Sequence, residues 1–227
     1  GTEWFGAAWD VGEWGFVKSA RPRFPGHRQP IVPYPGYLDG ADPKDVETEI
    51  ALAANAGIDV FLYDYYWYGG QVTQEEALEK GFLQAKNRDR LKFALMWCYH
   101  ERNDQFRPEN GKPRRRLMTL DHTPEEFLGL IDHAIARYFG RPEYWRKDGK
   151  LFLSVYNAMD LWKTWGSDTA KVRAATDEAR RRVRAAGLGE LHLNVQNLSP
   201  QQVPLAVEMG FDSVTDYGFG AWNVPKY

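Results

Sequence analysis

Capped helices and short apolar strands alternate along the chain from residue 42 onward, and this alternation limits the fold more than any other feature. Asp42 and Pro43 have the chemistry of a helix N-cap and of the first helical position. The helix that they predict ends near Gly57. Further helices are predicted to begin at Thr73, at Thr123, near Thr169 and at Ser199. Strands are predicted at 60–63, 93–96, 151–155, 191–195 and 213–215, with a first strand near 5–9.

Alternating helices and strands predict an α/β fold with a parallel sheet and right-handed crossovers. A doubly wound sheet is one solution, but no GxGxxG or GxxxxGK motif follows any strand, so its usual nucleotide-binding signatures are missing. A (β/α)8 barrel of the TIM type fits better, although it typically needs about 250 residues and eight strands. About six strands are present. We therefore expect one barrel domain over 1–227, either open at its edges or stabilised by a partner.

Charge and cysteine content exclude several classes of protein. The chain has 29 Lys and Arg against 31 Asp and Glu, whereas a protein that binds nucleic acid through its phosphates normally has a basic excess. No run approaches the roughly 18 apolar residues of a membrane span. The single cysteine, Cys98, cannot form an internal disulfide, and no Cys/His cluster has zinc-site spacing. We expect no nucleic-acid partner, no membrane span and no metal. The compartment and the oligomeric state stay open.

In a parallel barrel the functional residues lie at the carboxyl ends of the strands. Here these ends carry aromatic, amide and carboxylate side chains, and aromatic residues make up 15% of the chain. Sugar rings pack on Trp and Tyr, and their hydroxyls need amide and carboxylate partners, so we expect an oligo- or polysaccharide partner. The alternative is that these are ordinary polar turn residues. The predicted substrate-binding residues are Tyr66, Trp67, Trp97, His100, Asn157, Gln196, Asn197, Asp216 and Tyr217.

Glycoside cleavage normally uses two carboxyl groups, about 5 Å apart for retention or about 6.5–9.5 Å apart for inversion. Asp64 and Glu101 are the predicted catalytic residues of this chain. Two alternatives stay open: Asp64 as a buried structural acid, and His100 as a structural histidine. Asp59 and Asp212 precede strands, at the opposite end of the barrel, and we interpret them as structural.

Several segments of the chain resemble the glycoside hydrolase family 99-like proteins of the WbsX type. They are RPRFPGHRQP at 21–30, DPKDVETEIALAANAGIDVFLYDYYWYGG at 42–70, LKFALMW at 91–97 and SVTDYGF at 213–219. In the family the third segment usually continues as Trp-Ala-Asn, whereas here Trp97 is followed by Cys98 and Tyr99. The resemblance covers most of the chain and is strongest from 21 to 97.

This resemblance implies a (β/α)8 barrel that acts on glycans without a metal cofactor. The founding members are retaining endo-α-mannosidases and mannanases, described as using the 2-hydroxyl of the sugar itself as the nucleophile. Related proteins in polysaccharide gene clusters have a glycosyltransferase label. The catalytic carboxylates of the family lie in an Asn-Glu-Trp-type motif, which does not occur in this chain. Together with the strand count, this predicts a chain that lacks its C-terminal catalytic part.

The leading hypothesis is therefore a glycan-active, glycoside hydrolase-like domain. The alternatives are a non-catalytic glycan-binding domain and a glycosyltransferase of cell-surface polysaccharide synthesis. A glycosyltransferase usually binds a sugar nucleotide with a divalent metal, and no Asp-x-Asp motif occurs here. If the catalytic pair lies elsewhere, we expect this chain alone to bind sugars weakly and to turn over nothing, because catalysis needs groups that act in the transition state.

Overall fold

The computed structural model describes residues 14, 17–18, 20–99, 102–103, 116–118 and 122–216. These residues fall into two compact units. The first unit contains the residues up to 56, those from 74 to 88, and the short strands between 102 and 118. The second unit contains 57–73, 89–99 and 122–216. The single domain predicted over 1–227 stays a prediction, and the strand predicted near 5–9 lies outside the described residues.

The first unit contains the helix α3 (Pro43–Asn55), which begins where the sequence predicts. Asp42 is its N-cap and accepts a hydrogen bond from the backbone N–H of Lys44 at 2.8 Å, while Val46 and Ile50 form its buried face. The first unit also contains Gly81, where a Cβ would lie 2.0 Å from the carbonyl oxygen of Gly40. Only glycine allows the two backbone segments to approach each other this closely.

A helix was predicted to begin at Thr73, and this start is wrong, although helical structure does follow. Thr73 instead ends the strand β2 (Gln71–Thr73), and the next residue, Gln74, has a φ of 61° that interrupts any helix. Helical structure starts later and is irregular. It consists of the π-helix η2 (Ala77–Gly81) and the 3-10 helices η3 (Phe82–Gln84) and η4 (Arg88–Arg90). Further along the chain, the short strand β4 (Arg102–Asn103) pairs with β5 (Arg116–Met118).

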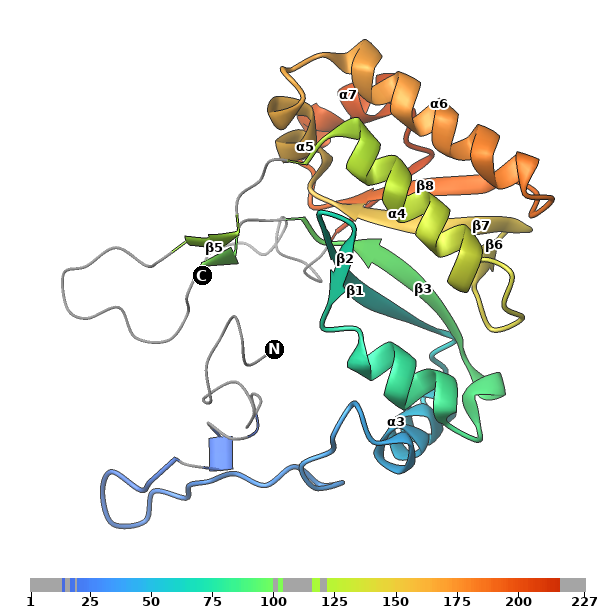
Figure 1. The fold of residues 1–227 in the computed structure, drawn as a ribbon. Helices are drawn as coiled ribbons and strands as arrows, with labels where there is room; N and C mark the ends of the chain where they lie inside the picture. The colour runs from blue at the N-terminus through green and yellow to red at the C-terminus, as the bar shows by residue number, and fades with distance from the viewer. Residues whose placement is uncertain are drawn as a thin grey trace. The chain divides into compact units, whose positions relative to one another are not determined.

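A parallel sheet forms the centre of the second unit (Figure 1). Its parallel strands are β1 (Val60–Tyr68), β3 (Lys92–Trp97), β7 (Lys150–Tyr156), β8 (Leu191–Gln196) and β9 (Ser213–Thr215), paired in that order. This confirms the predicted parallel pairing in sequential order. Two short antiparallel strands, β2 on β1 and β6 (Arg146–Lys147) on β7, were not predicted. Within the described residues β1 and β9 do not pair, so the sheet is open, as expected.

The helices of the second unit connect these strands, and their caps match the sequence. Thr123 caps α4 (Pro124–Arg137) by accepting from Glu126 N, and Asp168 caps α6 (Thr169–Ala185) by accepting from Lys171 N. Ser199, where a helix was predicted to begin, forms a capping box with Gln202 at the short helix η5 (Pro200–Gln202), which leads into α7 (Val203–Glu208). A further helix, α5 (Ala158–Thr164), follows β7 directly and was not predicted.

One face of the sheet packs against α4 and α6, which lie side by side (Figure 1). We call it the outer face. The indole of Trp97 stacks on Phe127 of α4 with ring centroids 5.5 Å apart, and that of Trp67 lies 4.9 Å from the ring of His133. Leu153 and Val195 on the neighbouring strands are also buried. This aromatic and aliphatic layer is the core of the second unit.

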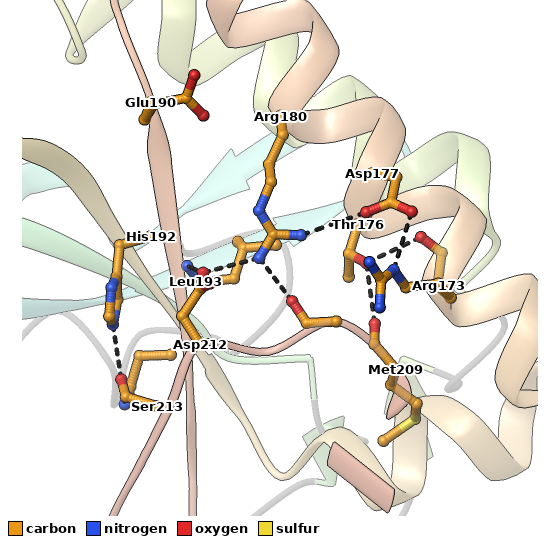
Figure 2. A network of polar contacts seen from close by, with 12 residues as sticks. Arg173, Thr176, Asp177, Arg180, Glu190, His192, Leu193, Met209, Asp212 and Ser213 are labelled. Carbon is orange, nitrogen blue, oxygen red and sulfur yellow. Dashed lines mark hydrogen bonds and ion pairs between the residues drawn. The ribbon is translucent and has the colours of Figure 1, made fainter. Parts of the chain in front are cut away.

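At the amino end of β9, Asp212 joins three segments (Figure 2). Its Oδ2 accepts from the backbone N–H of Leu193 at 2.8 Å and from Nη2 of Arg180 at 2.7 Å, and Arg180 also donates to the carbonyl oxygen of Gly210. Burial alone would raise the pKa of Asp212, but the Leu193 N–H and the Arg180 guanidinium together hold that pKa below its usual value. Asp212 therefore has the structural role predicted for it.

Candidate functional site

The other face of the sheet, which we call the inner face, carries a row of mostly polar residues. Strand register makes Asp64, Met96, Ser154, Asn194 and Ser213 successive partners across β1, β3, β7, β8 and β9. Partners in neighbouring parallel strands point to the same face, and side chains two residues apart along a strand do so as well. The next row toward the carboxyl ends therefore contains Tyr66, Tyr156, Gln196 and Thr215.

Asn194 is the centre of a hydrogen-bonded network on this inner face. Its Oδ1 accepts from the hydroxyls of Ser154 at 2.8 Å and Thr215 at 3.1 Å, and its Nδ2 donates to Oγ of Ser213 at 2.9 Å. Ser213 Oγ is also 2.7 Å from Nε2 of His192. Asn194 and Ser154 are completely buried. The interior of a (β/α)8 barrel is normally filled with Val, Ile and Leu, so this inner face departs from an ordinary core.

His192 lies at the amino end of this network and stacks on Phe152 with ring centroids 5.5 Å apart. Burial lowers the pKa of His192, and the charges of Lys147, Lys150 and Arg180 act in the same direction, while Asp212 opposes them. The imidazole is therefore held in its neutral form beside Ser213.

Nearer the carboxyl ends, the structure gathers several residues predicted to bind substrate. Asp64 is exposed in the middle of β1, because the strand continues to Tyr68. Its exposure rules out the alternative of a buried structural acid. Tyr66 and Tyr156 are half-buried, and Gln196 is buried. Asp216 follows β9 directly and is exposed.

Asn157 and Asn197 follow β7 and β8 at equivalent places, with φ of 56° and 62°. Both adopt the left-handed conformation that asparagine tolerates better than most residues. Nδ2 of Asn157 donates to Asp160 at 2.7 Å, and Nδ2 of Asn197 lies 3.5 Å from the hydroxyl of Tyr156. The left-handed backbone conformation therefore partly explains why asparagine follows both strands.

The two predicted stacking tryptophans lie on the outer face, which conflicts with a role as a sugar platform. Trp67 and Trp97 are both buried, and Trp97 has no exposed surface at all. Each is on the opposite face of its strand from Asp64 or Met96, because successive side chains alternate. We leave both out of the site. The remaining predicted residues, His100, Glu101 and Tyr217, lie outside the described residues.

The inner-face network was not predicted, although the sequence contains a signal for it. Residues 191–196 read Leu-His-Leu-Asn-Val-Gln, so every second side chain is polar. Such alternation indicates a strand with one polar face, whereas fully buried parallel strands are normally apolar throughout. Ser213, Val214 and Thr215 repeat the pattern on the next strand.

A buried polar contact at the start of α4 was also missed. Nδ1 of His122 lies 2.8 Å from Oε2 of Glu126, whose other oxygen accepts from the backbone N–H of Gly69 at 2.8 Å. The carbonyl oxygen of His122 accepts from Nε1 of Trp165 at 2.7 Å. These hydrogen bonds connect the turn after β1 to the start of α4, and they connect His122 to Trp165, the C-cap of α5.

Hydroxyl, amide and carboxylate groups suit a ligand rich in hydroxyls. Across the described residues, no group of three or more His, Cys, Asp or Glu side chains is arranged to hold a metal ion. The helices in this described part include none that is both long and apolar enough to cross a membrane.

The chain matches a known family over nearly its whole length. Residues 2–224 match the family described as glycosyltransferase WbsX. Two relatives, both called uncharacterized protein WxcX, come from Xanthomonas campestris pv. campestris strains B100 and ATCC 33913. Each is 26% identical over 226 residues, which cover 94% of this chain and 28% of the relative. The chain therefore spans less than a third of the length of these relatives.

Solved structures share the fold. A glycoside hydrolase-like protein has a TM-score of 0.54 and 23% identity, covering 82% of this chain and 53% of that one. Two structures of the GH99 endo-alpha-mannosidase from Bacteroides thetaiotaomicron have TM-scores of 0.50 and 0.51 at 14% and 18% identity. They cover 82% of this chain and 49% and 47% of theirs. Likeness at such low identity shows the fold alone, and it confirms the TIM-barrel class.

Proposed function

Because the chain belongs to the WbsX family, we propose that the inner face of its sheet is the glycan-binding surface of a glycoside hydrolase-like barrel. The observation that carries the proposal is the polar inner face itself. A closed barrel core gains stability from apolar side chains, whereas this face has two mostly polar rows, which include the exposed carboxylate of Asp64 and the half-buried Tyr66 and Tyr156.

The chemistry of these side chains fits a sugar. A carboxylate accepts hydrogen bonds from hydroxyl groups, and a carboxamide both donates and accepts, so Asp64 on β1 and Gln196 on β8 have the chemistry to bind sugar hydroxyls. Tyr66 and Tyr156 add aromatic rings for the apolar face of a sugar and phenol groups for further hydrogen bonds. In this proposal the two tyrosines replace Trp67 and Trp97 as stacking groups.

For the reaction we propose cleavage of an α-mannosidic bond by the full-length protein. The structural neighbour named endo-alpha-mannosidase supports this choice. Asp64 stays a proposed catalytic residue because it is exposed on the inner face. Glu101, the second predicted catalytic residue, keeps that role as a proposal. The family description favours a second candidate, transfer of a sugar from an activated donor.

A binding and turnover assay on the full-length protein tests the proposal. The probes are α-mannan oligosaccharides, supplied with or without GDP-mannose. We expect D64N to weaken oligosaccharide binding about tenfold or more, which corresponds to about 1.4 kcal/mol. The matched control is D59N, since Asp59 is an exposed aspartate just before the same strand.

Each outcome of this assay decides between the hypotheses. Release of shorter oligosaccharides without a nucleotide sugar supports the hydrolase, and elongation that requires GDP-mannose supports the glycosyltransferase instead. Binding without turnover supports a glycan-binding module. Absence of glycan binding, or equal loss of binding in D64N and D59N, overturns the proposed surface.

A further inference from the structure

The first turn of α5 differs from the first turns of the longer helices. In those helices the carbonyl oxygen of the N-cap residue accepts from the backbone N–H four residues later, which is the ordinary first bond of an α-helix. In α5 the N-cap is Asn157 and the matching N–H belongs to Leu161. The ordinary bonds are Val46 N to Asp42 O at 3.0 Å, Phe127 N to Thr123 O at 3.2 Å and Val172 N to Asp168 O at 3.3 Å.

In α5 the hydroxyl of Tyr99 stands between these two groups. Leu161 N donates to the Tyr99 hydroxyl at 2.7 Å, and the hydroxyl in turn donates to the carbonyl oxygen of Asn157. A phenol has one hydrogen to donate and a lone pair that accepts, so it satisfies both groups at once. The Asn157 carbonyl also accepts from Asp160 N at 3.0 Å. The phenol is thus inserted into the first turn of the helix.

The Tyr99 side chain is fixed firmly enough to hold this turn. It is buried, with its ring centroid 4.9 Å from that of Trp97 and 5.7 Å from that of His122, at 89° to the imidazole. Burial raises the pKa of the phenol well above its usual range, so the hydroxyl keeps the proton that it donates.

Asn157 is the residue that this arrangement positions. Its backbone N–H donates to the carbonyl oxygen of Gln196 at 3.2 Å, and its Nδ2 donates to Oδ2 of Asp160 at 2.7 Å. The carboxamide is therefore oriented, and among the described residues its Oδ1 has no hydrogen-bond partner. Asn157 is half-buried at the carboxyl end of β7, beside Tyr156.

We infer that Tyr99 is a positioning residue of the glycan-binding surface: its hydroxyl holds the first turn of α5 open and thereby orients the Asn157 carboxamide, whose Oδ1 accepts a hydroxyl of the bound sugar. This role of Tyr99 rests on the proposed function. It adds to the glycan-binding surface a residue that does not itself touch the ligand. Without the phenol oxygen, Leu161 N and Asn157 O can bond directly, which would tighten the turn and displace Asn157.

The test compares Y99F with Y144F in the full-length protein. Tyr144 is an unusually close control because its phenol is also buried and also joins a backbone acceptor to a backbone donor. Its hydroxyl donates to the carbonyl oxygen of Phe152 at 2.7 Å and accepts from Leu95 N at 3.4 Å. Both substitutions delete one buried bridging hydroxyl, but Tyr144 lies away from the carboxyl ends of the strands, since its partners stand well inside β3 and β7.

We expect both variants to lose similar thermal stability and only Y99F to weaken binding of α-mannan oligosaccharides, by about tenfold. N157A should weaken binding by a similar factor, and the double variant Y99F/N157A should bind no more weakly than N157A alone, because both changes remove the same contact. A crystal structure of Y99F should show Leu161 N bonded to Asn157 O.

The possible failures are distinguishable. If the wild type binds the oligosaccharide and D64N weakens binding, but Y99F and Y144F bind equally well, the positioning role is overturned while the proposed surface stands. Additive effects of Y99F and N157A overturn it as well. If the wild type binds no glycan, the proposed function fails, and the role of Tyr99 in glycan binding fails with it. The crystal structure of Y99F still decides whether the Tyr99 hydroxyl holds the first turn of α5 open.

Discussion

The two faces of the parallel sheet are built from the same strands but differ in their side chains: the outer face is aromatic and aliphatic, and the inner face is mostly polar near the carboxyl ends of the strands. On the outer face Trp97 is buried against Phe127, and the neighbouring Leu153 and Val195 extend that layer. On the inner face the residue that follows Leu153 is Ser154, and the residue that precedes Val195 is Asn194, joined to each other by a hydrogen bond of 2.8 Å.

This difference shows how one sheet separates stability from binding. Buried aromatic and aliphatic groups contribute to the free energy of unfolding roughly in proportion to the apolar area that they remove from water. A satisfied hydrogen bond contributes only about 0.5–1.5 kcal/mol, because the same groups bond to water in the unfolded chain. The outer face should therefore dominate stability, while the exposed Asp64 and the half-buried Tyr66 and Tyr156 of the inner face stay available to a ligand.

The largest expected effect is on the outer face. W97A removes a fully buried indole and should lower the free energy of unfolding by about 3–5 kcal/mol. The matched change on the inner face is Y66A, which removes a half-buried ring and should cost about 1 kcal/mol. Urea denaturation of the two variants of the full-length protein measures both values. If Y66A is as destabilising as W97A, the two faces do not differ as proposed.

A second prediction concerns the polar network of the inner face. N194L keeps the size of the side chain but leaves the buried hydroxyl of Ser154 without its acceptor, and it also removes the acceptor of the exposed Thr215 hydroxyl. An unsatisfied buried polar group costs about 1–3 kcal/mol, so we expect N194L to cost about 2 kcal/mol.

A double substitution checks the origin of this cost. In the N194L background, S154A removes one orphaned hydroxyl and should restore part of the lost stability, whereas S154A in the wild type should be destabilising. Equal effects of S154A in both backgrounds would mean that Asn194 and Ser154 are not coupled.

Local chemistry made much of the fold predictable. Thr123 and Asp168 act within one turn of the helices that they cap, so a short stretch of sequence contains the whole signal. The failures have non-local causes. Residues 71–73 are extended because they pair with β1, so Thr73 does not start a helix. The start of α5 depends on a hydroxyl from Tyr99, 58 residues before Asn157.

The sequence located most of the strands that carry the candidate site, but it did not show which side chains share a face. β3, β7, β8 and β9 end within one residue of their predicted ends, whereas β1 continues to Tyr68, past the predicted end at 63. The face on which a side chain lies depends on strand register, which the sequence does not show directly. Trp67 and Tyr66 are neighbours in sequence and lie on opposite faces of β1, so one packs against α4 while the other stays half-buried on the inner face. Amino-acid composition alone does not distinguish Trp67 from Tyr66 in this respect.

The smallest expected effect is the response of the inner face to pH. Burial lowers the pKa of His192 below its value in the unfolded chain, which is about 6.5. The unfolded chain therefore binds the proton more readily, and the stability tied to neutral His192 is fully present above that pH and is lost as the pH falls through the lowered pKa. Urea titrations between pH 7.5 and 5 should show a weaker loss of stability in H192Q than in the wild type. An unchanged slope in H192Q would mean that His192 titrates in the folded protein as it does in the unfolded chain.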